Sequence, residues 1–326
     1  MEGQLNQWLK QIIQIALIFY CATLIISCDS SPDYVTENHI LVVIDGVRFS
    51  ESWGDESHNN IPRQSQFMAP EGTLFTHVYN KGLTRTISSH AALVSGFYEE
   101  LENSGLEYPG YPSLLHRWLK KSKAPADKAW YITSKGKLAV LADTKDENWK
   151  GKYLPSQNCG IGGKGLQAGL GGKGYRSDEE TWEQVISVLS EYQPRLVLIN
   201  FKEPDTFGPH KTWEEYLQAI RQSDTYVFQL WQWLQNNSFY QNRTALYITS
   251  DHGRHLDGHT EGFLSHGDDC EGCQHISLLA LGPDFPKGRI IIEPYEIIDI
   301  PLTIGYLLGV EIPGSSGRLM QPLFVD

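Results

Sequence analysis

Aspartate and histidine residues recur in this sequence just after apolar runs, where their side chains could share one site. The recurring set holds three carboxylates and three imidazoles: Asp45, Asp205, His210, Asp251, His252 and His266. This combination of ligand types suits a pair of zinc-like divalent ions. Aspartate often follows a strand simply as a turn former, so each residue alone indicates little. Taken together, the set predicts a site for two metal ions.

A hydroxyl nucleophile for such a site lies in the segment GLTRTISSHAALVSGFY, at Thr86. Thr86 comes before a helix-like stretch, and the N-terminus of a helix favours an anion through its free N–H groups and its dipole. A threonine hydroxyl reacts only when its proton is removed or a cation stabilises the alkoxide. Without metal ions Thr86 is better interpreted as a helix N-cap, and with them it is a candidate nucleophile.

Three apolar runs rich in β-branched residues must position these groups. Residues 39–44, 195–201 and 244–250 are typical of strands buried on both faces of a parallel sheet, and each is followed by a carboxylate. In open α/β sheets, ligands bind at the carboxyl ends of the strands. Helical patterns at 177–192, 212–235 and 300–310 separate the strands. We therefore predict an α/β fold, a three-layer α/β/α sandwich with a mostly parallel central sheet.

The composition is that of one large globular domain. The chain has 326 residues, of which 40% are hydrophobic and 20% charged. Its formal net charge of -12 provides no global basic field, so nucleic acid is not expected as a partner.

The N-terminal segment, residues 1–27, has the pattern of a signal peptide. Its apolar run, from Ile12 to Ile26, is shorter than the roughly 20 residues that a spanning helix needs. The sequence LIISC resembles a bacterial lipobox, which implies that Cys28 is lipidated and anchors the protein to a membrane. The alternative is a plain membrane anchor. Both interpretations place the catalytic part outside the cytoplasm, at the periplasmic face or the cell surface, after a linker at 28–38.

Three cysteines remain beyond the export segment, namely Cys159, Cys270 and Cys273. In an oxidising compartment the pair in CEGC can close a short disulfide. A CxxC pair by itself does not make a zinc site, so the sequence favours a disulfide over metal ligation here.

Five segments occur in the order and rough spacing of the alkaline phosphatase superfamily: VVIDGVR, TRTISSHAALVSGFY, NFKEPDTFGPH, ITSDHGR and SHGD. The chain most resembles the branch of nucleotide pyrophosphatase/phosphodiesterases and threonine-nucleophile phosphatases. The resemblance covers nearly all of residues 39–326, the expected catalytic domain. It implies a central sheet between helices, two zinc ions, a phosphate ester substrate and a covalent phosphothreonine intermediate.

The resemblance also implies a role for each motif residue. One metal ion would be held by Asp205, His210 and His266, and the other by Asp45, Asp251, His252 and the oxygen of Thr86. Thr86 would attack the phosphoryl group in line and water would then release it, with net retention at phosphorus. Lys135 and Lys137 resemble a Lys and Arg pair that contacts a dianionic phosphate in monoesterases. Monoester and diester substrates both stay open.

Three departures from the pattern matter. Ser89 replaces an asparagine that binds a phosphate oxygen in the diesterase branch, so we expect it to be a shorter substrate-binding donor. The interval between Asp205 and His210 differs from the usual one. The segment TRTISSH lacks the Cys or Ser followed by Pro and Arg of sulfatases, which disfavours an ordinary sulfatase.

Other functions of the same superfamily remain as alternatives. These are a sulfatase-like enzyme, a transferase of phosphoryl head groups and a non-catalytic surface-binding lipoprotein. The stretches 99–112 and 146–176 are predicted cap insertions, which would determine the substrate.

Overall fold

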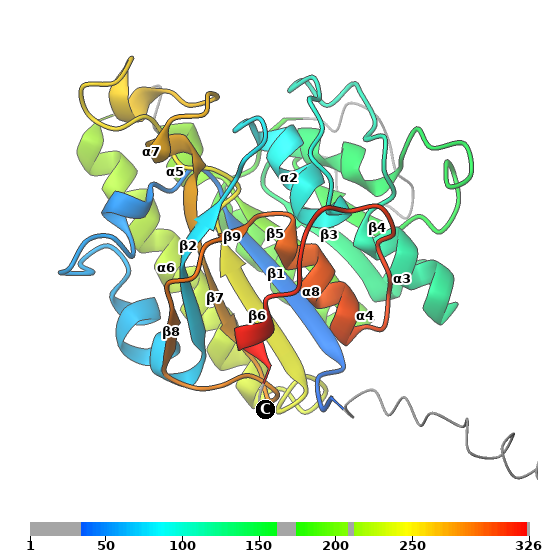
Figure 1. The fold of residues 1–326 in the computed structure, drawn as a ribbon. Helices are drawn as coiled ribbons and strands as arrows, with labels where there is room; N and C mark the ends of the chain where they lie inside the picture. Colours follow the sequence, from blue (N-terminus) through cyan, green and yellow to red (C-terminus); the bar gives the residue numbers. More distant parts are fainter. Residues whose placement is uncertain (1–33, 162–173, 208–211, 325–326) are drawn as a thin grey trace, which may run out of the picture. The chain divides into compact units, whose positions relative to one another are not determined.

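The computed structural model describes residues 34–161, 174–207 and 212–324. The predicted signal peptide, Cys28 and His210 therefore lie outside the described residues. Within these ranges nine strands form one sheet, in the order β4-β3-β5-β1-β6-β7-β2-β8, with β9 also paired to β2 (Figure 1). The strands are β1 Asn38–Ile44, β2 Thr73–Tyr79, β3 Ala129–Thr133, β4 Ser156–Cys159, β5 Leu196–Phe201, β6 Thr244–Thr249, β7 His275–Leu281, β8 Arg289–Ile291 and β9 Tyr295–Glu296.

Helices of several lengths connect these strands. The α-helices are α2 Thr86–Ser95, α3 Leu114–Ser122, α4 Asp178–Tyr192, α5 Glu203–Phe207, α6 Trp213–Asn236, α7 Glu271–Gln274 and α8 Asp299–Leu307. A capping box begins α4, since the Ser177 and Glu180 side chains each accept from the other's backbone N–H, and this helix confirms the helical pattern at 177–192. Among the described residues, no helix is both long and apolar enough to cross a membrane.

The sheet is mixed and mostly parallel. Strands β4, β3, β5, β1 and β6 are parallel neighbours, whereas β7 runs antiparallel to both β6 and β2. The three strands predicted from their apolar runs are β1, β5 and β6, and they lie side by side. Their carboxyl ends therefore meet at one edge of the sheet. Because β7 is reversed, its amino end and the short helix α7 before it come to the same edge.

Two hydrophobic cores cover the two faces of the sheet. Leu41 and Val43 of β1 pack in the core with α2, α3 and α8, while Ile40 and Val42 pack in the other core with α4 and α6 (Figure 1). Successive side chains of a strand point to opposite faces, so a strand covered on both sides must be apolar at every position. This arrangement confirms the predicted α/β fold with helices on both sides of a central sheet.

One of the predicted cap insertions contributes to the sheet. Residues Ser156–Cys159, inside the stretch 146–176, form the edge strand β4 and pair in parallel with β3. The stretch 99–112 is a loop without regular secondary structure. The role of both stretches in selecting a substrate remains a prediction.

Candidate active site and metal centre

Four neighbouring parallel strands each place a charged side chain at the carboxyl edge of the sheet. Lys135 follows β3, Asp205 follows β5, Asp45 follows β1 and Asp251 follows β6. Asp45 and Asp251 are fully buried, and Lys135 is almost so. Asp205 is partly buried, and three carboxylates gathered at such an edge are unfavourable unless cations face them. The carboxyl edge of the sheet therefore favours the presence of cations.

Gly46 allows the ends of two of these strands to approach closely. Its φ is +71°, a left-handed conformation that glycine adopts without strain. A Cβ at this position would lie 2.9 Å from the Cβ of Asp205. Any larger residue at Gly46 would therefore push Asp205 away from Asp45.

Thr86 is the first residue of α2, and it is not the helix cap. Arg85 occupies the N-cap position with extended backbone and caps through no side-chain hydrogen bond. The Thr86 hydroxyl instead accepts a hydrogen bond from Lys135 Nζ at 3.1 Å. The interpretation of Thr86 as an N-cap is therefore wrong. An ammonium that donates to this oxygen stabilises the alkoxide more than the hydroxyl.

Lys135 also neutralises two of the carboxylates. Its Nζ lies 2.9 Å from Asp45 Oδ1 and 2.6 Å from Asp205 Oδ2. The prediction made Lys135 a substrate-binding residue, and the structure places it between Thr86 and the candidate metal ligands. We infer that its charge holds the two carboxylates and the Thr86 hydroxyl in position relative to one another.

Carboxylate and imidazole groups gather beside Thr86 in two clusters. In each cluster, one potential ligand atom of every residue lies within 4.8 Å of the others; the clusters are Asp205, His252 and His266, and Asp45, His90 and Asp251. The sequence grouped His252 with Asp45 and Asp251. In the structure its ring stacks on that of His266 at 3.9 Å, and its Nε2 lies 3.2 Å from Asp251 Oδ2. His252 thus contacts both clusters.

Hydrogen bonds fix the tautomers of two of the imidazoles. His252 Nδ1 lies 2.9 Å from the carbonyl oxygen of Gly253, and His266 Nδ1 lies 2.7 Å from that of Thr84. A carbonyl oxygen only accepts, so each Nδ1 carries a proton. Burial lowers the pKa of His252 to about 3, which keeps its ring neutral. A backbone acceptor on Nδ1 with a free Nε2 is the usual arrangement of a histidine that binds a metal.

The buried atoms at this edge fit a divalent cation. Asp251 Oδ2 and His252 Nε2 are buried and make no hydrogen bond within the described residues, whereas the buried Asp45 Oδ1 is paired with the Lys135 ammonium. His252 Nε2 also lies 3.7 Å from Asp45 Oδ1. Asp251 Oδ2 and His252 Nε2, which lie 3.2 Å apart, repel one another through their lone pairs unless a cation lies between them. Asp45, Asp251 and His252 would hold one ion, and Asp205 with His266 would contribute to a second.

His90 is a residue of the site that the sequence analysis did not single out. Its Nδ1 lies 2.8 Å from the carbonyl oxygen of Thr86 and 3.3 Å from Asp251 Oδ2. Its Nε2 lies 3.2 Å from the Asn200 amide nitrogen, which also donates to Asp45 Oδ2 at 3.0 Å. Both ring nitrogens therefore have partners. We infer that His90 positions Thr86 and Asp251 and does not bind metal. Its place one helical turn after Thr86 was the signal available in the sequence.

Arg254 was also missed, although it belongs to the quoted motif ITSDHGR. This almost fully buried side chain donates to Asp205 Oδ1 and to the backbone carbonyls of Phe263 and Leu264. Lys135 and Arg254 carry two positive charges against the three carboxylates of Asp45, Asp205 and Asp251, so one negative charge stays uncompensated. This remaining charge again favours a bound cation.

The other predicted substrate-binding residues lie around the start of α2. The buried Ser89 hydroxyl accepts from the Asn80 amide and donates to the Leu83 carbonyl, so its hydrogen bonds are used inside the protein. Lys137 Nζ donates to Asn103 Oδ1, which also accepts from the backbone N–H of Ile87. Lys137 therefore lies near Thr86, together with an amide from the 99–112 loop.

Comparison with known structures identifies the fold of this protein. The phosphonate monoester hydrolase of Silicibacter pomeroyi superimposes with a TM-score of 0.63 at 15% identity, covering 89% of this chain and 76% of that one. Murine ectonucleotide pyrophosphatase/phosphodiesterase 5 gives 0.58 at 17% identity, over 88% of this chain and 100% of that one. The fold is thus that of the alkaline phosphatase superfamily.

Within this superfamily, the chain belongs to the sulfatase family, whose sequence model matches residues 37–310. Mouse steryl-sulfatase is 32% identical over 95 residues, which cover 24% of this chain and only 15% of that enzyme. The membership corrects the expectation that set this chain apart from sulfatases. That expectation rested on one motif around Thr86, whereas the family match extends over most of the chain.

Proposed function

We propose that this protein is a metal-dependent hydrolase of phosphate esters that uses Thr86 as its nucleophile. The observation that carries the proposal is the hydrogen bond from the buried Lys135 ammonium to Thr86 Oγ1 at the N-terminus of α2. A threonine that is neither a cap nor exposed, and that faces a cation and a helix N-terminus, is suited to act as an alkoxide.

The reaction consists of two displacements. Thr86 gives up its hydroxyl proton and its oxygen forms a bond to phosphorus, while the ester P–O bond breaks and the leaving alcohol takes up a proton. Water then attacks the phosphothreonine, the bond between phosphorus and the Thr86 oxygen breaks, the phosphate product leaves and the Thr86 hydroxyl regains a proton. Lys135 stabilises the negative charge on the Thr86 oxygen at the start of the first step and at the end of the second. Divalent ions, one held by Asp45, Asp251 and His252 and the other by Asp205 with His266, would supply Lewis acidity and charge neutralisation at the phosphoryl group.

The two lysines give the proposed reaction a pH dependence. Burial lowers the pKa of Lys137 to about 8, and the Lys135 ammonium acts in the same direction. A lowered pKa means that Lys137 loses its charge as the pH rises through about 8. We expect KM for an anionic aryl phosphate to rise above this pH, because one cation near Thr86 is lost.

The substitution Lys137→Arg tests this dependence. Arginine stays charged at every accessible pH, so KM of this variant should be flat between about pH 7 and 9. Steady-state kinetics of both proteins over this range provide the measurement. An identical rise of KM in the variant would show that another group causes it.

The family match and the steryl-sulfatase relative favour a second function, hydrolysis of sulfate esters. A panel of p-nitrophenyl phosphate, bis(p-nitrophenyl) phosphate and p-nitrophenyl sulfate separates the two. We expect kcat/KM for one of the phosphate esters to exceed that for the sulfate by about tenfold or more, a difference of at least ~1.4 kcal/mol in transition-state stabilisation. A preference for the sulfate would establish the second function instead.

A further inference from the structure

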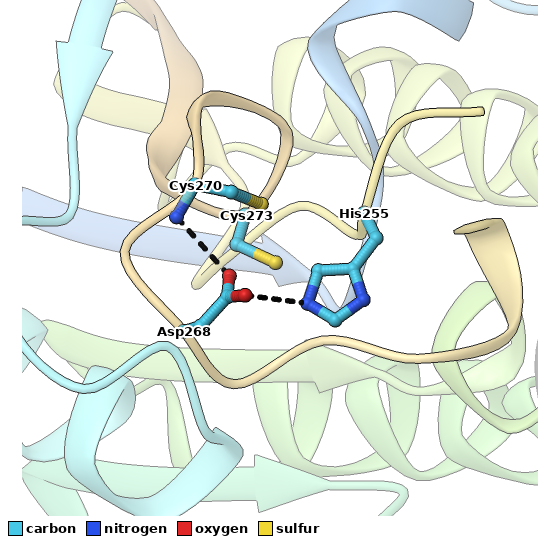
Figure 2. Close-up of side chains that lie close together, drawn as sticks. All are labelled: His255, Asp268, Cys270 and Cys273. Atoms are coloured by element: carbon cyan, nitrogen blue, oxygen red, sulfur yellow. Dashed lines mark hydrogen bonds and ion pairs between the residues drawn. The ribbon is translucent and has the colours of Figure 1, made fainter. Parts of the chain in front are cut away.

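A second group of metal-binding side chains lies in the loop between β6 and β7. His255 comes from the start of this loop, and Asp268, Cys270 and Cys273 come from its end. One potential ligand atom of each lies within 4.8 Å of the others. Figure 2 shows the four side chains converging on one small space, with the Cys273 sulfur facing the His255 ring.

The two cysteines are free thiols in the structure. Cys273 is fully buried and Cys270 is half-buried. Cys270 is the N-cap of α7 and Cys273 lies within this helix, whose first turn brings the backbone N–H of Cys273 to the carbonyl oxygen of Cys270 at 3.0 Å. The CEGC sequence alone favoured a disulfide, because it gave no sign of further ligands. The fold supplies such ligands, because it brings His255, fifteen positions before Cys270 in the sequence, close to both cysteines.

His255 is oriented as a ligand. Its Nδ1 lies 3.0 Å from Ser265 Oγ, a hydroxyl that can accept the ring proton. Its Nε2 lies 3.1 Å from Asp268 Oδ2 but makes no hydrogen bond within the described residues, although the side chain is only 5% exposed. This buried nitrogen faces a carboxylate oxygen without the geometry of a hydrogen bond, an arrangement that a cation between the two atoms would stabilise. Asp268 is held in place by its own bond from the Cys270 backbone N–H at 3.1 Å.

We propose that His255, Asp268, Cys270 and Cys273 bind one zinc ion, in a site separate from the one at Thr86. Two thiolates, one imidazole and one carboxylate make four ligands, each of a type that zinc binds and enough to complete its tetrahedral coordination. Thiolate ligands select a soft transition metal and exclude calcium and magnesium, which take oxygen ligands. Binding releases the two thiol protons to solvent and forms two zinc–sulfur bonds.

The distances require little rearrangement. Ligand atoms about 2.0–2.3 Å from a tetrahedral zinc ion lie roughly 3.3–3.8 Å from one another. Starting from a spread within 4.8 Å, each pair of ligand atoms needs to approach by at most about 1.5 Å.

The proposed ion fixes a loop that supports the active site. The same loop carries His266, and the carbonyl oxygen of Asp268 accepts from the Thr84 hydroxyl at 2.6 Å. Gly253, next to His252, donates its N–H to the Cys273 carbonyl at 2.8 Å. An ion that joins the two ends of this loop therefore holds His266 and the segment before Thr86 in position, without touching the substrate.

Cobalt substitution tests this proposal, because it gives an absorption signal that the metal site around Thr86 cannot produce. The full-length chain is reduced, freed of metal with a chelator and titrated with Co²⁺ without oxygen. Thiolate ligands produce sulfur-to-cobalt charge-transfer absorption in the near ultraviolet, and the residues assigned around Thr86 include no cysteine. We expect this absorption to appear, to be displaced by Zn²⁺ and to be lost in Cys270→Ser/Cys273→Ser.

Matched variants distinguish a four-ligand zinc site from two alternatives. In one, the two thiols alone bind cobalt; in the other, cobalt binds at the site around Thr86. Cys159→Ser and Asp251→Asn should keep the absorption, since neither residue belongs to the proposed site. His255→Gln and Asp268→Asn retain both thiols and should weaken cobalt binding at least about tenfold. Circular dichroism checks that each variant is folded. If the double cysteine variant does not fold, the His255→Gln and Asp268→Asn variants provide the test.

Three results would overturn the proposal. The first is no charge-transfer absorption in the reduced wild-type chain. The second is absorption that persists at full strength in His255→Gln and Asp268→Asn, which would indicate a simple CxxC pair. The third is a wild-type chain that lacks two thiols after denaturation and gains no metal on reduction, which would establish the disulfide.

Discussion

Replacing Thr86 by valine is expected to lower kcat for aryl phosphate hydrolysis by about a thousandfold or more. Valine keeps the branched shape at the first position of α2 and removes only the hydroxyl that accepts from Lys135. Without this oxygen no covalent intermediate can form. Steady-state and single-turnover rates of the two proteins provide the measurement.

Thr86→Ser is the matched control, because serine restores the hydroxyl without the methyl group. It should retain a large part of the activity and, after acid quenching during turnover, yield a peptide phosphorylated at position 86. The wild-type chain should yield the corresponding phosphothreonine. Full activity in Thr86→Val would show that another group attacks the substrate, and the proposed mechanism would then be abandoned.

The substitution Lys135→Met is expected to have the largest effect on stability. It removes the buried ammonium that lies 2.9 Å from Asp45 and 2.6 Å from Asp205. Removing one partner of a buried ion pair leaves an uncompensated charge and typically costs about 3–5 kcal/mol. Urea unfolding in the presence of a chelator measures the loss. Added Zn²⁺ should recover part of it, because a bound cation again neutralises the carboxylates.

Lys145→Met is a suitable control for the same type of residue. Lys145 pairs with Glu107 at 2.9 Å, but 54% of its side chain is exposed. An exposed pair contributes less than about 1 kcal/mol, so this variant should unfold almost like the wild type. Equal stabilities for the two methionine variants would show that Lys135 does not compensate the buried carboxylates.

The fold could be predicted because its signals are local. The run from His39 to Ile44 is apolar at nearly every position, which only a strand covered on both faces requires. Ser177 and Glu180 stand at capping-box spacing, and α4 begins there. Such patterns need no knowledge of distant residues. The order of the strands was not predicted, because pairing between β1 and β5 joins segments more than 150 positions apart.

The candidate site was predicted in part. Asp45, Asp205 and Asp251 were found because each follows a recognisable strand, and parallel strands bring such ends to one edge. The role of Lys135 as an internal cation was not predicted. A lysine after a strand has the same local sequence whether its ammonium faces solvent or, as here, two carboxylates and a hydroxyl.

The sequence by itself determined which chemistry is available: carboxylates and imidazoles at strand ends, and a threonine at the start of a helix. Tertiary structure decided which of these groups meet. His90 contacts Asp251, Arg254 pairs with Asp205, and His255 joins Cys270 and Cys273 only in the folded chain. The physical reason is that spacing along the chain specifies local backbone geometry, whereas hydrogen bonds, ion pairs and metal ligation depend on distances set by the packing of remote segments.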